Sequence, residues 1–406
     1  MSAFALLFAA IELLSPSGDV PIKIVPECQR TVMTNETLEA REAIFAADRK
    51  HGKKLRHSHG WRKACPLVLK WKATDGEGGP WEIKLSKNAD LSDARVMFMR
   101  AGKIDPATGR EVGGGGKPSD TFTFEVPRAN LEIATKYYWS VKSDLICRRH
   151  HWTRDCKCKK SRAPTTSATG SFTTEDFAPR WIAIEGNVGN FRDLGGRIGI
   201  GGRRVRQGLV YRSQGLNSNS VEGSVPGRNR LTVEDVKYLV GTLGIKTDLD
   251  LRTSVERADM TVSPMGGDVR YIYCASPSYE GIFNEGGKRR MAENFRVFCD
   301  RKNYPVLFHC IGGADRTGAL AYVLNGVLGV CRRELETDWE STFYPNIPIR
   351  DDKGNLVWNS ELHFENGFSK YGGPEDGWNR RIELYLLDCG VTAEEIAKFR
   401  SIMLEK

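Results

Sequence analysis

The sequence predicts an α/β fold class in two parts, an all-β sandwich over residues 20–175 followed by an α/β domain over residues 176–406. Three observations lead to this prediction. Residues 20–175 contain short segments in which apolar and polar side chains alternate, whereas residues 177–406 alternate strand-like with helix-like runs. The chain of 406 residues is also long enough for two domains with separate cores.

Residues 1–19 precede the predicted sandwich, and we interpret them as a candidate export signal or an N-terminal extension. The first fourteen residues, MSAFALLFAAIELL, are apolar, as in the hydrophobic part of a signal peptide. Against an export signal, no Lys or Arg precedes the run and Glu12 interrupts it. The run is too short to span a bilayer.

The predicted sandwich contains segments rich in β-branched and aromatic residues, bounded by Gly, Asp, Asn and Pro. These expected strands are Val68–Ala73, Trp81–Ser86, Val96–Arg100, Thr121–Val126, Tyr137–Ser143 and Gly170–Thr174. A helix-like insert, Asn35–Lys50, interrupts the pattern. Residues 159–179, which are rich in Ser, Thr, Pro and Ala, form the end of this part and the linker.

The α/β domain is expected to have a mainly parallel central sheet flanked by helices. Its expected strands are Thr247–Leu251, Arg270–Cys274 and Pro305–Cys310. Its expected helices are Thr232–Leu243, Lys288–Arg301, Ala319–Leu328, Asn379–Leu387 and Ala393–Leu404, the last with Thr392 as N-cap and Glu395 three residues later.

A cysteine and an arginine, Cys310 and Arg316, are separated by five residues between the strand Pro305–Cys310 and the next helix. The intervening Ile311, Gly312, Gly313, Ala314 and Asp315 include two glycines that let the backbone curl with its N–H groups inward. Such a nest at a helix N-terminus binds anions, so we assign Ile311 to Ala314 to substrate binding.

The same field stabilises a thiolate, which makes Cys310 a candidate nucleophile near neutral pH. The planar guanidinium of Arg316 can hold two phosphoryl oxygens at once. The hydroxyl of Thr317 is placed to donate to the sulfur and help it leave as a thiolate. A bland reading, a buried cysteine followed by a solvated arginine, does not explain the glycines or the flanking elements.

The segment His309-Cys310-(five residues)-Arg316-Thr317 resembles the H-C-x5-R-[ST] loop of cysteine-based protein tyrosine phosphatases. Upstream blocks narrow the resemblance: Asn190–Gly196 reads NFRDLGG, Leu209–Ser213 reads LVYRS and Gly244–Arg252 reads GIKTDLDLR. Together they resemble the bacterial and fungal tyrosine and phosphoinositide phosphatase family from Phe177 to about Lys406. The resemblance implies a phosphomonoester hydrolase without metal or other cofactor, which acts through a phosphocysteine intermediate.

A general acid must protonate the leaving oxygen. In the family resembled, the loop carries an Asp directly before the Arg, and this chain has Asp315 there. We therefore assign the acid to Asp315; the alternative is that this carboxylate only orients Arg316. Asp268 or Glu280, in the loop-like stretch after the Thr247–Leu251 strand, would then be the acid.

The loop departs from the family at Ala314, where close relatives have a Lys that is associated with highly charged phosphoinositides. This departure favours phosphotyrosine or another singly phosphorylated substrate. The run Lys288-Arg289-Arg290 would restore the charge if it faced the cleft, although a solvated helix face is the simpler interpretation. The alternative substrate is a phosphoinositide or inositol phosphate.

The NFRDLGG block is expected to support the loop, through Arg192 or Asp193, or to be only a tight turn at its two glycines. His309 is a further expected supporting residue. Asp250 and Arg252 are expected to close a parallel strand and brace the loop rather than react.

Three segments are similar in sequence to strands of a fibronectin type III module: TKYYWSV (Thr135–Val141), SFTT (Ser171–Thr174) and Trp81–Ser86. Such modules are typical of exported bacterial enzymes, so we expect a secreted or periplasmic protein, with a cytoplasmic one not excluded. The module is expected to bind a protein or a surface ligand, or to act as a spacer.

A further cluster, His150, His151, Cys156 and Cys158, has no usual zinc spacing and lies among Arg and Lys, so we expect a disulfide or no role there rather than a metal. The net charge of +9 is spread over the chain apart from residues 148–162, and no groove interleaved with aromatics is visible. We therefore expect phosphorylated ligands and no nucleic acid.

Two other interpretations stay open. The fold can serve as a phosphate-recognition or adhesion module with lost or marginal catalysis, although every residue that the chemistry requires is present. Arsenate reductase-like use of the loop would need a resolving cysteine, for which Cys274 and Cys299 are the candidates.

Overall fold

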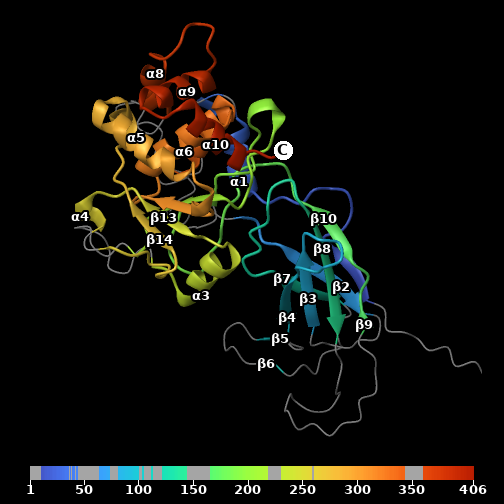
Figure 1. Ribbon diagram of the computed structural model, residues 1–406. Coiled ribbons are helices and arrows are strands. Elements are labelled where there is room, and N and C mark those ends of the chain that lie inside the picture. The colour runs from blue at the N-terminus through green and yellow to red at the C-terminus, as the bar shows by residue number, and fades with distance from the viewer. Residues whose placement is uncertain are drawn as a thin grey trace, which may run out of the picture. The chain divides into compact units, whose positions relative to one another are not determined.

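The computed structural model describes residues 11–35, 37, 39–41, 43, 64–73, 81–99, 103–104, 111–112, 121–143, 165–217, 230–257, 260–342 and 360–406. The chain divides into two compact units (Figure 1). Unit 1 comprises residues 1–24 and 66–175, and unit 2 comprises residues 25–65 and 176–406. Along the chain, unit 2 is therefore entered twice.

Unit 1 contains two antiparallel sheets. The strands of the first are, in spatial order, β1 (Ile11–Ser15), β2 (Val68–Ala73) and β7 (Thr121–Glu125). Those of the second are β10 (Gly170–Thr173), β8 (Lys136–Ser143), β3 (Trp81–Ser86) and β4 (Arg95–Met99), with β9 (Thr165–Thr166) also paired to β8. The short strands β5 (Lys103–Ile104) and β6 (Glu111–Val112) pair with each other.

The two sheets of unit 1 share an aromatic core. The Trp71 ring of β2 lies 5.5 Å from the Trp81 ring of β3, and the Phe122 ring of β7 lies 4.9 Å from the Trp81 ring. Along β3, Trp81, Ile83 and Leu85 are buried while the residues between them are half-buried. This alternation has the period of two that a strand gives, with one face toward the core.

Two expectations about the N-terminal part need correction. Ile11–Ser15, which we placed in the segment before the sandwich, forms β1 and pairs with β2, so the sheet already includes Ile11. Residues 25–65, which we placed within the sandwich, group with unit 2, where Glu27–Thr34 forms helix α1. Most of the helix-like insert Asn35–Lys50 lies outside the described residues.

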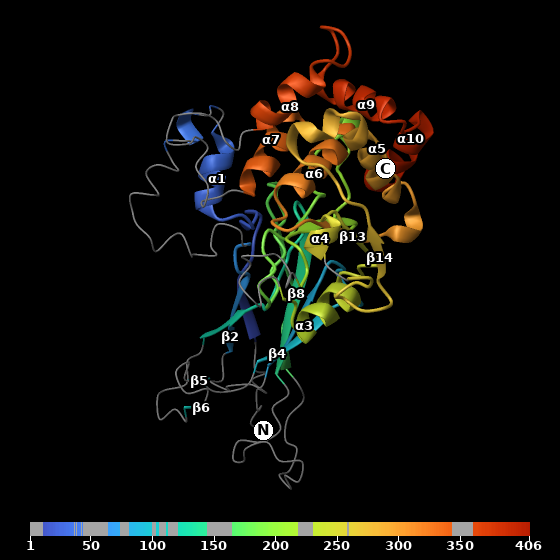
Figure 2. The same cartoon turned by 90° about the vertical axis from the view of Figure 1, so that its left-hand side faces the viewer.

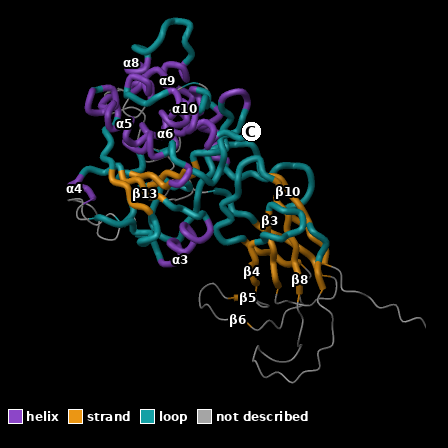
Figure 3. Tube along the Cα trace, in the orientation of Figure 1, coloured by secondary structure: helices purple, strands orange, loops and turns teal. Residues whose placement is uncertain are grey.

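Unit 2 is built on a five-stranded sheet (Figure 3). In spatial order its strands are β11 (Arg192–Asp193), β12 (Val210–Ser213), β15 (Val306–His309), β13 (Thr247–Asp250) and β14 (Arg270–Tyr273). β12, β15, β13 and β14 pair in parallel, and β11 pairs antiparallel with β12. Because the register aligns Ser213, Asp250 and His309, the carboxyl ends of three strands meet at one edge.

Each face of this sheet is covered. Val306 and Phe308 of β15 belong to one apolar cluster, and Leu307 between them belongs to another, as the alternation of a strand requires. Figures 1 and 2 show helices α5 and α6 over one face and α3 (Val233–Val236) on the opposite side. The helices that contribute to the first cluster are α5 (Glu285–Val297), α6 (Asp315–Val327), α7 (Arg332–Ser341), α8 (Ser360–Phe368), α9 (Trp378–Asp388) and α10 (Ala393–Met403).

The expected helix starts agree with the structure where a cap marks them. Thr392 accepts a hydrogen bond from the Glu395 amide at the start of α10, and Thr232 does the same with Asp235 at the start of α3. The segment Lys237–Thr242 continues α3 as a π-helix. In the described part of the chain, no helix combines the length and apolar character needed to cross a membrane.

Candidate active site

Cys310 directly follows β15 at the carboxyl edge of the parallel sheet, between the ends of β12 and β13. Cys310 is buried, and Asp315, five residues later, begins helix α6. The helix therefore starts at Asp315, four residues before the expected Ala319. The segment Cys310–Arg316, which we call the phosphate loop, is consequently the link between strand and helix that the sequence predicts.

The carbonyl groups of the phosphate loop are held from outside. Ile311 O accepts a hydrogen bond from the Gly215 amide at 2.9 Å, and Gly313 O accepts from Asn190 Nδ2 at 2.8 Å and from Arg212 Nη2 at 2.7 Å. Asn190 Nδ2 also lies 3.3 Å from Gly312 O. Because a trans peptide points its N–H opposite to its C=O, the next three amides face the other side, as an anion cradle requires.

Gly313 has a sequence-specific reason to be glycine. Its φ is +62°, and a Cβ at this position would lie 2.4 Å from Ser213 O, the last residue of β12. No side chain fits between the loop and the strand end. Because of this close approach, the end of β12 fixes the position of the loop relative to the edge of the sheet.

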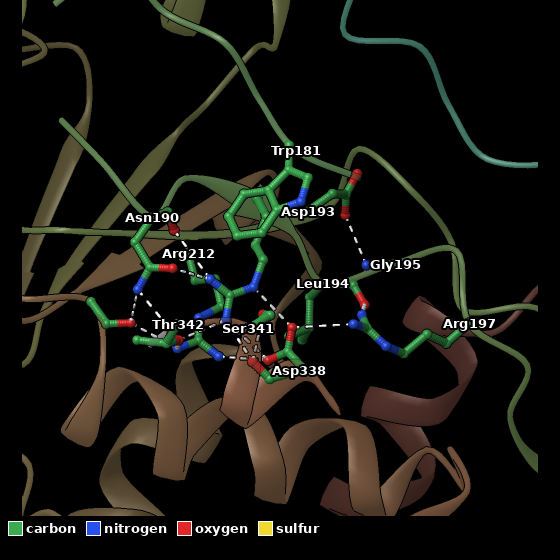
Figure 4. Close-up of polar contacts among 12 residues, drawn as sticks. Trp181, Asn190, Asp193, Leu194, Gly195, Arg197, Arg212, Asp338, Ser341 and Thr342 are labelled. Atoms are coloured by element: carbon green, nitrogen blue, oxygen red, sulfur yellow. Dashed lines mark hydrogen bonds and ion pairs between the residues drawn. The ribbon is translucent and has the colours of Figure 1, made fainter. Parts of the chain in front are cut away.

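Behind the loop, one buried carboxylate holds three arginines (Figure 4). Asp338 of α7 accepts from Arg192 Nε at 2.9 Å, from Arg212 Nη1 at 2.6 Å and from Arg197 Nη2 at 3.2 Å. All four side chains are buried. We call these four residues the arginine–aspartate cluster.

The cluster carries more positive than negative charge. Burial, and then repulsion from Arg192, lowers the pKa of Arg212 to about 9, so its guanidinium is still charged at neutral pH. Burial alone would raise the pKa of Asp338, but attraction to Arg192, Arg212 and Arg197 holds it well below its usual range. The net positive charge of these four residues behind the loop favours an anion or a thiolate in front of it.

The cluster is joined to the loop by Asn190 and Thr342. Asn190 Oδ1 accepts from Arg192 Nη1, while its Nδ2 donates to the loop carbonyls. Thr342 Oγ1 accepts from Arg192 Nη2 at 3.0 Å and lies 3.4 Å from Asn190 Nδ2. Arg192 therefore braces the loop through a neighbour rather than by direct contact.

Asp193, the second supporting residue of the NFRDLGG block, has a different place. It binds Arg180 Nη1 at 2.9 Å and accepts from the amides of Gly195 and Gly208 at 2.8 and 2.6 Å. Asp193 therefore stabilises the tight turn at the two glycines and not the phosphate loop. The expected supporting role applies to Arg192, and the expected tight turn applies to Asp193.

Arg316 is oriented by Glu256, which the sequence analysis did not single out. Both Nη atoms of Arg316 bind the Glu256 carboxylate, one of them at 2.8 Å. The hydrogen bond from Arg316 lowers the pKa of Glu256 to about 2. Glu256 lies in the short helix α4 (Ser254–Arg257), just beyond the carboxyl end of β13. Glu256 follows a strand that ends at the same sheet edge as β15, and this position was the sequence feature from which a role near Cys310 could have been predicted.

Asp315, at the first position of α6, accepts a hydrogen bond from the hydroxyl of Tyr279. Tyr279 has a φ of +52°, which is rare for a bulky residue and is kept only where surrounding structure imposes it. Its ring packs 6.2 Å from Trp339 and 4.4 Å from His363. Asp315 thus has a partner other than Arg316.

His309, expected to support the loop, lies in a buried charge network below Cys310. Its Nε2 is 2.9 Å from Asp248 Oδ1 and its Nδ1 is 3.8 Å from Asp250 Oδ1. Burial lowers the pKa of His309, but attraction to Asp248 outweighs this and leaves the pKa raised. Arg252 Nη2 binds Asp250 Oδ2 at 2.6 Å, so this pair closes the strand end.

Three other assigned residues lie as follows. Ala314 is half-buried and is the N-cap residue of α6. Thr317 is fully buried, and its hydroxyl has no hydrogen-bond partner among the described residues. Glu280 Oε1 lies 2.8 Å from His363 Nδ1.

Asp268 is wrongly placed to be an acid. It precedes β14, whereas Cys310 follows β15, and the two strands are parallel members of one sheet. A four-residue strand separates the two edges by about 13 Å. The same geometry counts against Cys274 as a resolving cysteine, because β13 lies between its strand and β15, which gives about 10 Å between the strands.

The basic run after residue 287 is divided by the structure. Lys288 binds Asp388 at 2.7 Å and Glu285 at 3.2 Å, while Arg289 and Arg290 line a cavity of about 660 Å³. Glu293, which binds Arg290 at 2.7 Å, also lines this cavity. The expected cluster of His150, His151, Cys156 and Cys158 lies outside the described residues.

The geometry described above coincides with a family match. Residues 183–354 match the tyrosine phosphatase family. This range includes the phosphate loop, Glu256, Tyr279 and the arginine–aspartate cluster. The matched range lies within unit 2.

Two curated relatives are named tyrosine-protein phosphatases. One, from Cupriavidus necator, is 29% identical over 192 residues, which cover 39% of this chain and 64% of the relative. Another, from Nostoc commune, is 28% identical over 126 residues, which cover 26% of this chain and 42% of the relative. The matches thus span less than two thirds of either relative's length.

Among solved structures, similarity is found to the core catalytic domain of the PP-IP phosphatase SIW14 from S. cerevisiae in complex with citrate. The identity is 14%, the TM-score is 0.25, and the match covers 34% of this chain and 78% of that chain. A second structure of the Siw14 catalytic core gives a TM-score of 0.24 at the same identity.

Proposed function

We propose that the chain is a cysteine-dependent phosphomonoester hydrolase, most simply a protein-tyrosine phosphatase. The observation that carries the proposal is the phosphate loop after Cys310, in which the Ile311, Gly312 and Gly313 carbonyls accept hydrogen bonds from residues outside the loop, so that the next three amides face the other side. Arg316, held by Glu256, supplies the charge that fixes two phosphoryl oxygens. The family match of residues 183–354 supports the same chemistry.

In the proposed first step, the Cys310 thiolate attacks phosphorus while the bond from phosphorus to the leaving oxygen breaks. Asp315 gives its proton to that oxygen, so a neutral alcohol or phenol departs. In the second step, water attacks the phosphocysteine, Asp315 takes a proton from the water, and the sulfur leaves as a thiolate. The buried Thr317 hydroxyl needs a partner, and the thiolate is the partner that we propose.

Hydrolysis of an aryl phosphate from pH 4 to 9 tests this proposal. The wild type is expected to turn over without added metal, and Cys310→Ser is expected to lose the activity. Asp315→Asn is expected to be slower and to lack the basic limb of the pH profile. Full activity of Asp315→Asn would assign the acid to another residue. A reduced wild type without turnover would favour a phosphate-recognition module.

A phosphoinositide or inositol phosphate is the second candidate substrate. It is supported by the cavity that Arg289 and Arg290 line, because Ala275, two residues beyond the carboxyl end of β14, also lines this cavity. Ala314 lacks the charge that a lysine would bring to the loop, and Glu293 pairs with one arginine, so we favour a singly phosphorylated substrate. Competition between phosphotyrosine peptide and an inositol bisphosphate measures the preference.

We also propose that the sandwich of unit 1 is a fibronectin type III-like module. Its strands divide into a sheet of three, β1, β2 and β7, and a sheet with β3, β4, β8 and β10, as in the sandwich architecture that immunoglobulin-like domains share. Binding of a protein or surface ligand by this module, and a secreted or periplasmic location, remain parts of the proposal. Alkaline phosphatase fusion at the N-terminus and cell fractionation test the location.

A further inference from the structure

Helix α1 (Glu27–Thr34) lies in the sequence between β1 and β2 of unit 1, yet it belongs to unit 2. We call the described residues from Glu27 to Arg41 the insert. Sequence analysis had no reason to connect the insert with catalysis, because no motif of the phosphate loop or its supports lies there. Two of its contacts with the rest of unit 2, those with helix α7 and with Trp181, lead toward the arginine–aspartate cluster.

The insert binds α7 on both sides of Asp338. Arg333 Nη2 donates to Asn35 O at 2.7 Å and to Met33 O at 3.1 Å. Arg41 Nη2 donates to Glu340 Oε1 at 2.9 Å, and each side chain of this pair is only 5% exposed. Asp338, the carboxylate of the arginine–aspartate cluster, lies between these two attachment points on the same helix.

The second contact reaches the cluster from the other side. Trp181 Nε1 donates to Gln29 Oε1 at 2.7 Å, and both side chains are fully buried. The Arg192 guanidinium lies over the Trp181 ring, 5.2 Å from its centroid. Figure 4 shows this ring beside the arginines that bind Asp338. Gln29 therefore fixes the surface on which Arg192 rests.

We propose that the insert is a positioning element for the phosphate loop. It fixes α7 and Trp181, and these two in turn position the arginine–aspartate cluster. The cluster then fixes the carbonyls of the loop. The inference rests on the proposed function only for its catalytic readout, because anion binding by the loop reports on it as well. Each link is a hydrogen bond, an ion pair or a ring contact between buried groups. Such contacts transmit a displacement because packed interiors have few alternative arrangements.

The buried ion pair of Glu340 with Arg41 strengthens the coupling between the insert and the arginine–aspartate cluster. Removing one partner from a buried ion pair is strongly destabilising, whereas removing both is often tolerated. Loss of Arg41 leaves Glu340 only the longer ion pair with Arg333 Nη1, at 4.0 Å, and so favours a movement of α7. Because Glu340 is two residues from Asp338, movement of this turn displaces the cluster.

The test uses the full chain with variants Arg41→Met, Gln29→Met and the double variant Arg41→Met with Glu340→Gln. Arg30→Met is the matched control, since the Arg30 guanidinium lies over the ring of Phe177, a contact that does not lead to α7. Two quantities, kcat/KM for an aryl phosphate and the Kd for tungstate as a phosphate-loop probe, are measured at a temperature at which circular dichroism shows every variant folded. The melting temperature of each variant is measured separately by a thermal scan.

Arg41→Met and Gln29→Met are expected to weaken tungstate binding and to lower kcat/KM, each on the order of two- to thirtyfold. The double variant is expected to recover most of the loss seen in Arg41→Met, and Arg30→Met is expected to stay within about twofold of the wild type. Lower melting temperatures with unchanged tungstate affinity and kcat/KM would overturn the inference. So would an equal loss in Arg30→Met.

Failure of the proposed function gives a different pattern. If the wild type binds tungstate but does not hydrolyse aryl phosphates, the catalytic proposal fails and tungstate affinity alone decides the role of the insert. If Arg41→Met does not fold, Gln29→Met and the double variant decide it, because neither removes the closest partner of a charged, buried carboxylate.

Discussion

The hydroxyl of Tyr279 donates a hydrogen bond to the carboxylate of Asp315, the residue that directly precedes Arg316. Asp315 is therefore held from the 3₁₀ helix Tyr279–Phe283, while Arg316 is held from α4 by Glu256. The two adjacent side chains have separate partners on separate segments. This separation argues against a role for Asp315 that is limited to orienting the guanidinium.

Tyr279→Phe removes the hydroxyl and keeps the ring that packs on Trp339 and His363. We expect phenyl phosphate hydrolysis to fall about tenfold, a part of the effect of a positioned acid, and an activated aryl phosphate to be nearly unaffected. Rates for both substrates check this. Tyr304→Phe is the control, because its hydroxyl binds a backbone carbonyl, Phe298 O. Equal losses for both substrates would mean that Tyr279 acts only through structure.

Glu256→Gln leaves Arg316 without its carboxylate, so the guanidinium no longer has one fixed orientation. We expect kcat/KM to fall by up to about 100-fold, with little change in melting temperature because the pair is partly exposed. The wild type is expected to show no Glu256 limb above pH 4: the folded-state pKa is lowered to about 2, so the pair is lost only as the pH falls toward that value. A limb near pH 4.5 that disappears in Glu256→Gln would contradict this.

Asp338→Asn removes the charge that three buried arginines share. We expect the free energy of unfolding to fall by about 3–5 kcal/mol, as for other buried ion pairs that lose one partner. Urea denaturation measures it. Asp388→Asn is the control, since Asp388 binds Lys288 at the surface and such pairs contribute about 0–1 kcal/mol. Similar losses in both variants would refute the special role of the cluster.

Gly313→Ala places a methyl group 2.4 Å from Ser213 O at a φ of +62°. We expect a loss of at least about 1 kcal/mol of stability and a weaker tungstate affinity, because the loop must move away from β12. Gly267→Ala is the control, since a Cβ at this position, outside the phosphate loop, would meet nothing within 4 Å. Indistinguishable tungstate affinities would show that the loop does not depend on this approach.

The Asp250–Arg252 pair predicts a loss of stability in acid. Burial would raise the pKa of Asp250, but His309 and Arg252 lower it to about 2. The pair therefore contributes its full stability above the ordinary pKa of 3.8, and this contribution is lost as the pH falls toward 2. Unfolding free energies of the wild type and Asp250→Asn should converge between pH 4 and pH 2. A constant difference over that range would contradict the assignment.

The parts of the fold that local patterns determine were predictable. Strands such as Val68–Ala73 and Trp81–Ser86 follow from alternation, and α10 follows from the capping box of Thr392. The loop around Cys310 was predictable because its residues are contiguous. Local periodicity decides these elements, and no distant contact is needed to recognise them.

The supports of the site were not predictable in the same way. Asp338, Glu256 and Tyr279 lie far from Cys310 in sequence and meet the loop or its neighbours only through the sheet topology. A single buried carboxylate in a helix such as α7 carries no local pattern that distinguishes it from a surface residue. The role of the insert was even harder to predict, because its residues lie in the sequence between two segments of unit 1.

That arrangement has a consequence for dissecting the protein. Unit 2 is not one continuous stretch, so a fragment that starts at Asp176 discards Gln29 and Arg41 together with unit 1. A truncation experiment would then confuse the effect of removing unit 1 with the effect of removing part of unit 2. Replacing unit 1 by another domain would have the same effect unless residues 25–65 were kept with residues 176–406.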